Sequence, residues 1–387
     1  MKPRAHIFAT FLIAASIVST AGAEASVDCA PSSPAVLTRS LVYSGPDSIS
    51  KFYRIPALAV APDGAIVAVA DRRLDTNRDL PSRIDVVARR STDGGRTWSP
   101  VIEVAVHDSV GGYGDPGLGV NKKGDLVVVM THGNGLWEST PDNHGTIYTT
   151  RSTDGGLSWS EPVDITAGLF ASDGTGPVQA VTAFATSGHI ETLRDGTMMF
   201  ALVTRPNEKK WSELEIYPVR STDGGRSWKI IPVAVDADAD ESKIVQAADG
   251  SLLMSIRNRR KGYRKFARST DRGRSWTPVE KSTTLPDPAC NGDVISYRHR
   301  GHNYLLHTVP DSHTDRRDVS LFASADNGAT WRKLITLCPA WSVYSAIAEL
   351  PDGTLGCLTE EGNTDGGLRI WFTRLDVGSL LDKQFGE

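Results

Sequence analysis

Short apolar runs recur along the chain, and each one is preceded by a turn signal. Asp63 and Gly64, for example, precede an apolar run at 65–70. Runs of this length bounded by turn residues are typical of β-strands. The same arrangement occurs at five further places, with runs at 125–130, 197–203, 251–256, 302–306 and 354–358. The chain is therefore predicted to contain six strands of one kind.

Between these runs the chain repeats a second pattern, Ser-x-Asp-x-Gly-x-x-Trp, which we call the Asp box. Each copy follows a segment of alternating apolar and polar residues, as expected for the turn of a β-hairpin. The Asp can accept backbone N–H bonds, the Gly can adopt a positive φ, and the Trp ring can pack beside the strands. The five copies lie at 91–98, 152–159, 221–228, 269–276 and 324–331.

A structural role explains all five Asp boxes at once, whereas sugar or metal sites would require five equivalent loops to bind a ligand. The fourth and fifth copies vary, with Arg272, Ala325 and Asn327 at positions where other residues are usual. A structural turn tolerates such changes. We therefore interpret the boxes as hairpin turns without chemistry of their own.

The two repeats together predict an all-β fold. The Asp boxes begin at intervals of 48 to 69 residues, a spacing that matches propeller blades. The six apolar runs indicate six such units. We expect a six-bladed β-propeller of four-stranded antiparallel blades, whose repeats extend from about residue 52 to residue 372 without a linker.

The N-terminal segment, residues 1–23, has the pattern of a secretory signal peptide. Basic residues precede an apolar stretch at 7–18, and small residues at 21–23 supply a cleavage site. The stretch is too short to span a membrane, and no later segment predicts an integral membrane span. We expect export to the periplasm or the medium, with 24–387 forming a single β-propeller domain.

Charge and cysteine content narrow the classes of partner. The 387 residues carry a formal net charge of −4, which argues against a nucleic-acid surface and leaves anion binding to local arginines. No spacing of Cys or His indicates a metal site, and no cofactor is expected. In an exported protein one or two disulfides could form among Cys29, Cys290, Cys338 and Cys357.

The candidate chemistry gathers at one end of the predicted strands. Because neighbouring strands are antiparallel, the start of the strand before each turn lies beside the end of the strand after it. Nine or ten residues before the six turn glycines stand Arg54, Asp115, Ser187, Glu241, Asn291 and Tyr344. The ends of the following strands and the loops beyond them add 71–73, His132, Arg257, Glu360, Asp79 and Arg316. Innermost strands surround the propeller axis, so these residues are expected to ring one pocket.

Each of these residues has a simpler structural interpretation. Charged side chains are mostly exposed, so a single Arg or Glu is usually a solvated charge or part of an ion pair. Glu241 and Arg257 could form a plain salt bridge, and a Tyr beside a Glu could be a hydrogen-bonded core pair or a phenol with a base. Three arginines near one axis instead favour a binding site for an anion, because a bound carboxylate or phosphate would offset the repulsion between their charges.

The motif Tyr53-Arg54-Ile55-Pro56, followed by the Asp boxes, resembles the Arg-Ile-Pro motif of the sialidases (exo-α-neuraminidases), particularly secreted bacterial ones. The resemblance covers nearly all of the chain beyond the signal peptide. It implies that Arg54, Arg257 and Arg316 are the three arginines that bind the carboxylate of the substrate. Arg317, the neighbour of Arg316, is the alternative for the third position.

The same resemblance implies roles for the remaining residues. Sialidases are glycosidases with a Tyr nucleophile, and Tyr344 with Glu241 matches the Tyr and Glu pair. Asp79 matches the acid/base, with Asp75 as second choice. The other matches are Arg73 as an arginine beside the acid, with Arg72 less favoured, and Asp115 as an aspartate near the ring substituents.

The resemblance thus implies a monomeric exo-sialidase without a cofactor, acting on sialylated glycoproteins, glycolipids or oligosaccharides. A trans-sialidase, hydrolytic or intramolecular, would share every one of these residues. A non-catalytic Asp-box propeller that binds glycans or proteins is the alternative of another class, and it would be expected to lack some members of the ring.

Overall fold

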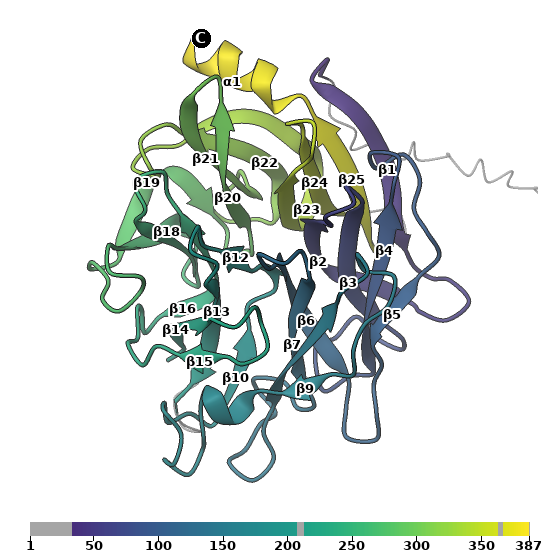
Figure 1. Ribbon diagram of the computed structural model, residues 1–387, viewed down its shortest axis with the longest axis vertical. Coiled ribbons are helices and arrows are strands. Elements are labelled where there is room, and N and C mark those ends of the chain that lie inside the picture. The colour runs from purple at the N-terminus through teal and green to yellow at the C-terminus, as the bar shows by residue number, and fades with distance from the viewer. Residues whose placement is uncertain (1–32, 207–212, 363–366, 387) are drawn as a thin grey trace, which may run out of the picture.

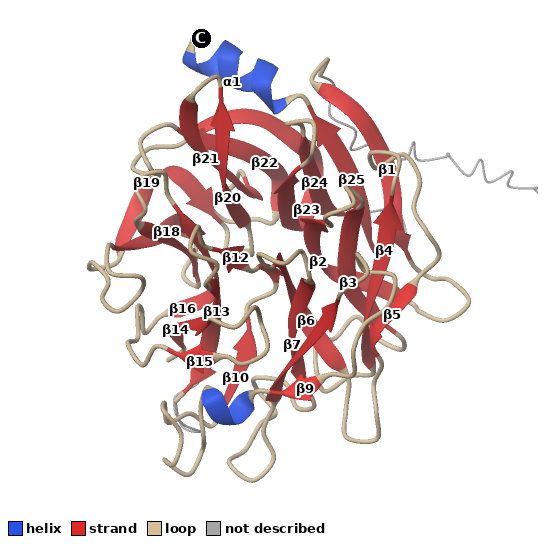
Figure 2. Ribbon diagram, viewed as in Figure 1, coloured by secondary structure: helices blue, strands red, loops and turns tan. Residues whose placement is uncertain are grey.

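The computed structural model describes residues 33–206, 213–362 and 367–386. Within this part, strands dominate, with one 3-10 helix, η1 (Thr166–Gly168), and one α-helix, α1 (Val377–Phe385). The strands form five sheets arranged around a common centre (Figure 1), and loops connect them at both ends (Figure 2). The predicted all-β class is confirmed.

Two of the sheets are antiparallel and have four strands each, in the orders β2-β3-β4-β5 and β16-β17-β18-β19. Consecutive strands are neighbours, as the hairpin signals predict. The strands are β2 (Phe52–Val60), β3 (Ile66–Arg73), β4 (Ile84–Ser91), β5 (Ile102–Ala105), β16 (Ala239–Gln246), β17 (Leu252–Asn258), β18 (Gly262–Ser269) and β19 (Glu280–Asp287).

Two further sheets have five strands each. One has the order β11-β6-β7-β8-β9, and the other has the order β10-β13-β14-β15, with β12 also paired to β13. The strands are β6 (Tyr113–Val120), β7 (Leu126–His132), β8 (Thr146–Ser152), β9 (Val163–Asp164), β10 (Thr182–Ala185), β11 (Gly188–His189), β12 (Glu191–Thr192), β13 (Met198–Arg205), β14 (Glu215–Ser221) and β15 (Lys229–Ile230).

The strand predicted to start at Ser187 is interrupted. Gly188 has a φ of 98°, which glycine adopts readily and other residues do not. The chain changes direction there, so that β11 pairs in parallel with β6 of the neighbouring sheet while β12 pairs antiparallel with β13.

The fifth sheet has seven strands in the order β1-β25-β24-β23-β22-β21-β20. It is continuous because β23 is 18 residues long, pairing with β22 up to Trp341 and with β24 from Ser342 onward. The strands are β1 (Val36–Ser44), β20 (Asp293–His299), β21 (His302–Pro310), β22 (Arg317–Ser324), β23 (Arg332–Glu349), β24 (Leu355–Gly362) and β25 (Leu368–Leu375).

Strand β1 brings the N-terminal part of the described chain beside its C-terminal part. It pairs antiparallel with β25, from Val36 opposite Leu375 to Ser44 opposite Arg369, and Figure 1 shows the two strands side by side. The sequence did not predict this strand, because it precedes the first repeat and carries no turn signal of the repeated kind.

The six predicted apolar runs are the strands β3, β7, β13, β17, β21 and β24. Every residue of β3 and β7 is buried, because both faces of these sheets pack against neighbours. One hydrophobic cluster, for example, joins Val67 of β3 to Leu118 and Leu126 of the next sheet. The core therefore lies between the sheets as well as along their strands.

The Asp boxes form the predicted turns. In the first copy the Ser91 hydroxyl accepts a bond from the Gly95 N–H at 2.8 Å, and the Asp93 carboxylate accepts two from the Arg96 and Thr97 N–H groups at 2.9 and 3.0 Å. The Trp98 ring packs edge-on against Phe372 of β25, with centroids 5.4 Å apart. The turn thus fastens one sheet to the next.

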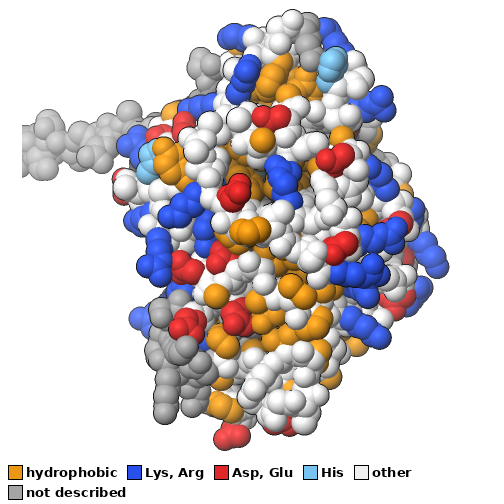
Figure 3. All heavy atoms as spheres, turned by 90° about the vertical axis from the view of Figure 1, so that its left-hand side faces the viewer, with side chains coloured by type: hydrophobic (Ala, Val, Ile, Leu, Met, Phe, Trp, Pro, Cys, Tyr) orange, Lys and Arg blue, Asp and Glu red, His pale blue; other side chains and the backbone are white. Residues whose placement is uncertain are grey.

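Several sequence predictions concern residues outside the described ones, among them the signal peptide at 1–23 and Cys29. Within the described ranges, Cys290, Cys338 and Cys357 are buried and form no disulfide with one another. No helix in those ranges is long and apolar enough to cross a membrane. On the face shown in Figure 3, acidic and basic side chains are interspersed.

Candidate active site

A cavity of about 850 Å³ opens where the starts of several innermost strands meet. Its walls come from β2, β6, β16 and β23, from the end of β17, and from the loops around 78–82 and 135–138. Seven of the residues that the sequence singled out line it, namely Arg54, Asp79, Asp115, Glu241, Arg257, Arg316 and Tyr344. An eighth, Arg73, is buried and bonds to Asp79.

A β-bulge lies at the cavity end of each of these four strands. The register shifts between Arg54 and Ala57 in β2, and β6, β16 and β23 shift at the equivalent place. A bulge re-aims the side chains of the bulged strand. The four residues at or within these bulges, Arg54, Asp115, Glu241 and Tyr344, all line the cavity.

Two of the bulges contain a backbone conformation that is rare outside glycine. Ile55 has a φ of 58° and Asp115 a φ of 56°. Such conformations cost free energy, most of all for a β-branched residue, and concentrate at functional sites. The Ile55 N–H donates to the carboxylate of Glu360 at 2.6 Å, which helps to hold the strained segment in place.

Tyr344, Glu241 and Arg257 form one hydrogen-bonded group. The Tyr344 hydroxyl donates to Oε1 of Glu241, and Nη1 of Arg257 donates to Oε2 of the same carboxylate and, at 3.2 Å, to the Tyr344 oxygen. The Glu241–Arg257 salt bridge and the Tyr344–Glu241 hydrogen bond therefore meet at one carboxylate.

The charges of this group favour an ionised Glu241 beside a neutral Tyr344. Burial raises the pKa of Glu241, but Arg257 and the hydrogen bonds from its neighbours outweigh burial and hold that pKa well below its usual range. Burial and the charge of Glu241 raise the pKa of Tyr344 well above its usual range. At rest, the proton thus stays on the phenol.

Arg54 is held by a carboxylate that is completely buried. Its Nε and Nη2 donate to Glu360 at 2.8 and 3.0 Å, in a two-pronged pair. The same carboxylate accepts from the Tyr344 N–H at 3.2 Å. Glu360 therefore ties Arg54 and the backbone of Tyr344 together.

Arg316 comes from the loop that precedes β22. Its Nη2 donates to the carbonyl of Ala289 at 2.8 Å. The guanidinium carbon of Arg316 lies 5.8 Å from the centre of the Tyr344 ring, and that of Arg54 lies 5.4 Å from the same ring. With Arg257 bonded to the Tyr344 oxygen, all three arginines surround this one side chain.

Asp79 projects from the loop between β3 and β4. Its side chain is 77% exposed, and Oδ1 accepts from Nη2 of Arg73 at 2.7 Å. Arg73 is fixed in turn by Asp71, at 2.9 Å. An exposed carboxylate thus pairs with a buried guanidinium.

Asp71 also connects this pair to Asp115, whose N–H donates to its Oδ1 at 3.1 Å. Burial raises the pKa of Asp71 to about 6, although Arg73 opposes the shift. Burial and the charges of Asp71 and Asp79 raise the pKa of Asp115 well above its ordinary value. Because several carboxylates lie close together in this site, they carry fewer negative charges than isolated carboxylates would.

The second-choice residues have other partners. Asp75 pairs with Arg83 at 2.7 Å, Arg317 with Asp318 at 2.8 Å, and Arg72 with Asp85 at 2.7 Å. None of Asp75, Arg317 and Arg72 belongs to the described lining of the cavity. Of the first choices, Asp79 and Arg316 line the cavity, and Arg73 bonds to Asp79 from behind it.

The ring of polar residues is less complete than the sequence predicted. Ser187, Asn291 and His132 are buried without lining the cavity. Asn291 donates to the Ser187 hydroxyl at 2.9 Å and accepts from Nζ of the buried Lys243 at 2.8 Å. These residues form a polar layer of the core.

The sequence also missed several residues that line the cavity. Asp240 lies 3.5 Å from Nη2 of Arg257, and burial raises its pKa to about 8 against the pull of that arginine. Its position directly before Glu241 in the bulge was the available signal. Leu136, Trp137 and Phe184 give the cavity an apolar wall, and no turn signal or motif marks them.

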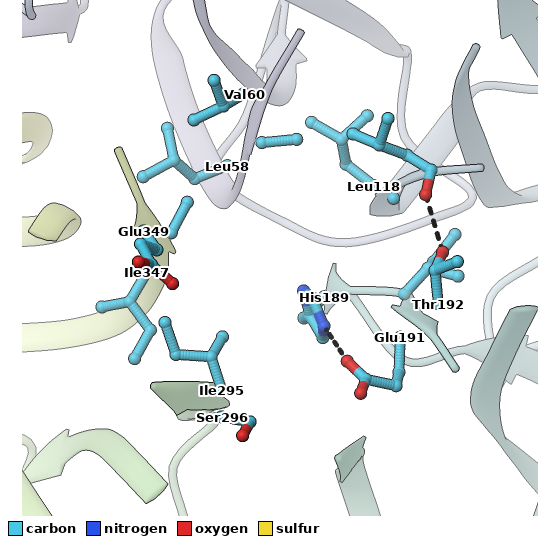
Figure 4. Close-up of a pocket in the computed structure, with 15 residues that line it drawn as sticks. Leu58, Val60, Leu118, His189, Glu191, Thr192, Ile295, Ser296, Ile347 and Glu349 are labelled. Carbon is cyan, nitrogen blue, oxygen red and sulfur yellow. Dashed lines mark hydrogen bonds and ion pairs between the residues drawn. The ribbon is translucent and has the colours of Figure 1, made fainter. Parts of the chain in front are cut away.

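A second cavity, of about 330 Å³, lies at the opposite ends of the same inner strands (Figure 4). Leu58, Leu118, Ile295 and Ile347 form much of its wall, and His189 and Glu191 bond to each other at 2.9 Å on one side. It has no cluster of arginines and no tyrosine among its described lining residues. The candidate chemistry is therefore confined to the first cavity.

No group of three or more His, Cys, Asp or Glu side chains among the described residues has an arrangement that could hold a metal ion. The chemistry of the first cavity is instead that of arginines, carboxylates and one phenol. Such a set can bind an acidic ligand and transfer protons.

Comparison with known proteins gives a consistent picture. Residues 81–357 match the model of the BNR repeat-like domain family. A sialidase of Micromonospora viridifaciens is 35% identical over 335 residues, which are 80% of this chain and 50% of that protein. A sialidase of Bacteroides fragilis is 29% identical, over 81% of this chain and 61% of that protein. The chain thus spans about half the length of the first of these relatives.

Solved structures with the same fold include the Hadza microbial sialidase Hz136. It superposes with a TM-score of 0.76 at 29% identity, covering 86% of this chain and 67% of that one. The intramolecular trans-sialidase of Ruminococcus gnavus superposes with a TM-score of 0.72 at 18% identity, covering 90% of this chain and 99% of that one. The second likeness concerns the fold alone.

Proposed function

Because the chain belongs to the BNR repeat-like domain family and, with its bacterial relatives, to the sialidases, we propose that it is an exo-sialidase. The reaction is the hydrolysis of terminal α-linked sialic acids, by a double displacement that retains configuration. The observation that carries the proposal is the hydrogen bond from Tyr344 to Glu241 in a cavity that three arginines also line.

Arg54, Arg257 and Arg316 bind the carboxylate of the sugar. Sialic acid carries that carboxylate on its anomeric carbon, so a carboxylate nucleophile would approach against a negative charge. A neutral phenol avoids this repulsion. The positions of all three guanidinium groups around the Tyr344 ring support this role, because they hold the anomeric carbon near the phenol.

In the first step the Tyr344 oxygen bonds to the anomeric carbon while its proton passes to Glu241. Asp79 donates its proton to the glycosidic oxygen, and the leaving alcohol departs. In the second step Asp79 takes a proton from water, the water oxygen displaces Tyr344, and Glu241 returns the proton to the phenol. Tyr344, Glu241 and Asp79 all end in their original protonation states.

The charge balance of the cavity supports Glu241 as the base. Arg257 keeps the pKa of Glu241 low while the cavity is empty of substrate. A bound carboxylate would offset part of the charge of Arg257, so the basicity of Glu241 would rise when substrate arrives. Arg73 orients Asp79, and Asp115 lies where it can contact ring substituents.

We also propose that the sheets are six four-stranded blades of a propeller. The division falls in β23, where pairing passes from β22 to β24 between Trp341 and Ser342. The seven-stranded sheet then separates into β20 to β23 and β23 to β25 with β1. The order of strands in the remaining sheets is compatible with one blade each.

Export follows from the predicted signal peptide at 1–23, with 24–387 as one catalytic domain that acts as a monomer in the periplasm or the medium. The substrates are sialylated glycoproteins, glycolipids or oligosaccharides. Export and the monomeric state are independent of the geometry of the cavity and are tested separately, by sequencing the N-terminus of the exported protein and by measuring its mass in solution.

A trans-sialidase reaction, hydrolytic or intramolecular, would use the same residues, and one of the structural neighbours is an intramolecular trans-sialidase. The two reactions differ only in what attacks the intermediate in the second step. Products formed from a sialoside with and without added lactose distinguish them, because transfer yields sialyllactose and the intramolecular reaction yields an anhydro sugar. A binding module without catalysis would give neither.

The decisive experiment is hydrolysis of a fluorogenic sialoside by the purified protein, with NMR observation of the first sialic acid formed. We expect release of the α-anomer before mutarotation. Absence of hydrolysis would reject the enzyme, and initial formation of the β-anomer would reject the tyrosine-linked intermediate.

A further inference from the structure

Arg264 and Asp287 form an ion pair that is completely buried, with 0% of either side chain exposed and 3.1 Å between Nη1 and Oδ2. Removing two charges from water costs about as much as their attraction returns, so a buried ion pair is weak evidence of stability. Arg264 also leaves its Nη2 without a partner among the described residues.

On one side the pair holds the strand that carries Arg257. Oδ2 of Asp287 accepts from the N–H of Asn258 at 2.8 Å, and Nε of Arg264 donates to the hydroxyl of Ser255 at 2.9 Å. These two residues flank Arg257 at the end of β17. The pair thus holds the backbone N–H directly after Arg257 and a side chain two residues before it.

On the other side the pair holds the turn that receives Arg316. Oδ1 of Asp287 accepts from the N–H of Cys290 at 3.0 Å, and Nη1 of Arg264 donates to the carbonyl of Cys290 at 2.7 Å. The preceding residue, Ala289, has a φ of 61° and accepts the bond from Arg316. The turn therefore offers its carbonyl to Arg316 only in the shape that the pair imposes.

We propose that Arg264 and Asp287 are positioning residues that set the relative placement of Arg257 and Arg316, and so determine the preference of the cavity for a carboxylate. Neither belongs to the described lining of the cavity, so they act through the two arginines. The inference rests on the proposed function, because it assumes an acidic sugar as ligand. Beyond the proposed function, it identifies two residues that hold Arg257 and Arg316, which come from different segments, in position to bind one carboxylate.

The test compares two ligands that differ in one group: 2,3-didehydro-2-deoxy-N-acetylneuraminic acid and its carboxamide. Calorimetry measures both dissociation constants without turnover. The variant combines Arg264→Met with Asp287→Asn, so that no unpaired charge remains buried. We expect the preference for the acid over the amide to fall at least about tenfold, the loss expected when one charged hydrogen bond is misplaced, while the amide binds as before.

The matched control combines Lys265→Met with Asp236→Asn. Lys265 is the neighbour of Arg264 on β18, and its ion pair with Asp236 is also largely buried. This control makes the same change of charge next to the first pair. We expect it to keep the preference of the wild type, which would separate a positioning effect from the general loss of a buried ion pair.

Arg264→Lys provides a milder variant if the double substitution does not fold. Lysine keeps the charge beside Asp287 but lacks the fork that reaches Ser255 and Cys290 together, so a smaller loss of preference is expected. A folded variant of either kind with the wild-type preference would overturn the proposal. If the wild type itself binds acid and amide equally, the acidic ligand is wrong and the proposal falls with it. If the wild type prefers the acid but does not hydrolyse the sialoside, only the proposed activity fails.

Discussion

At the scale of single residues, the catalytic hypothesis depends on one oxygen atom. Tyr344→Phe removes it and leaves the ring between the arginines. We expect kcat for an aryl sialoside to fall at least about 10³-fold, as for the loss of a nucleophile elsewhere, with little change in melting temperature. Tyr148→Phe is the control, because Tyr148 is partly buried outside the cavity. Hydrolysis at the wild-type rate by the Tyr344 variant would exclude this nucleophile.

A second residue-scale prediction concerns the carboxylate behind Arg54. Glu360→Gln removes the charge that receives both prongs of the guanidinium. We expect KM for the sialoside to rise about tenfold, because a charged hydrogen bond contributes about 1.5–3 kcal/mol, with a smaller effect on kcat. The neighbouring Glu361→Gln serves as control, since Glu361 pairs with Arg39 instead, at 2.7 Å. Equal changes in the two variants would argue against a specific role for Glu360.

At the scale of elements, the Asp boxes make stability depend on pH. Burial raises the pKa of Asp154 and is the largest single influence on it, but the bonds from Ser158, Ser152 and the Leu157 N–H together outweigh burial and lower this pKa to about 2. Because folding lowers the pKa of this carboxylate, its ionised form stabilises the protein at pH values above the pKa of the group in the unfolded chain, about 3.9. This contribution is lost as the pH falls toward about 2.

Asp154→Asn imitates the protonated state and keeps the shape of the side chain. We expect the variant to be less stable than the wild type at pH 7, and the two free energies of unfolding to converge between about pH 4 and pH 2. Denaturant unfolding at a series of pH values measures this. Glu161→Gln, in the exposed segment after the same box, should show no such convergence. A constant difference across that range would mean that the turn does not depend on the charge of Asp154.

The elements themselves were largely predictable from the sequence. Strands such as β3 are buried on both faces, so their apolar runs are continuous, and the glycine turns and Asp boxes mark where they end. The interruption at Gly188 was not predictable, because a glycine in a strand indicates either a weak position or a change of direction. Tertiary pairing with β6 decides between the two.

The candidate site was predictable wherever a side chain sits at a fixed distance from a turn. This rule found Arg54, Asp115, Glu241 and Tyr344, but it also selected Ser187 and Asn291, which are buried away from the cavity. It failed for the apolar wall around Trp137, which lies in a loop, and for the pair of Arg264 and Asp287, whose partners come from β17 and from the turn at Cys290. Contacts between segments distant in sequence leave no local pattern, and neither do the bulges that direct the side chains into the cavity.

At the scale of the whole molecule, β1 closes the fold. The sequence repeats do not predict this strand. Its inward residues are part of the core that packs β25 against the first repeat. Tyr43, for example, stacks on Tyr53 with ring centroids 5.0 Å apart and donates to the carbonyl of Ala68 at 2.8 Å. An open ring would expose the edge of β25 and the apolar faces on both sides of it.

Two adjacent positions in β1 test this closure. Val42 is 2% exposed and Leu41 is 40% exposed, and the register with β25 shifts between Leu41 and Tyr43, so that Val42 and Tyr43 both face the core. Val42→Asp buries an unpaired charge at the junction and should destabilise the fold by at least about 3 kcal/mol. Leu41→Asp makes the same chemical change on the outside and should cost less than about 1 kcal/mol. Urea unfolding followed by tryptophan fluorescence compares them, and since the Asp-box tryptophans are spread around the ring, loss of closure should shift the whole transition. Equal midpoints for the two variants would show that the molecule does not rely on β1 to hold its first and last sheets together.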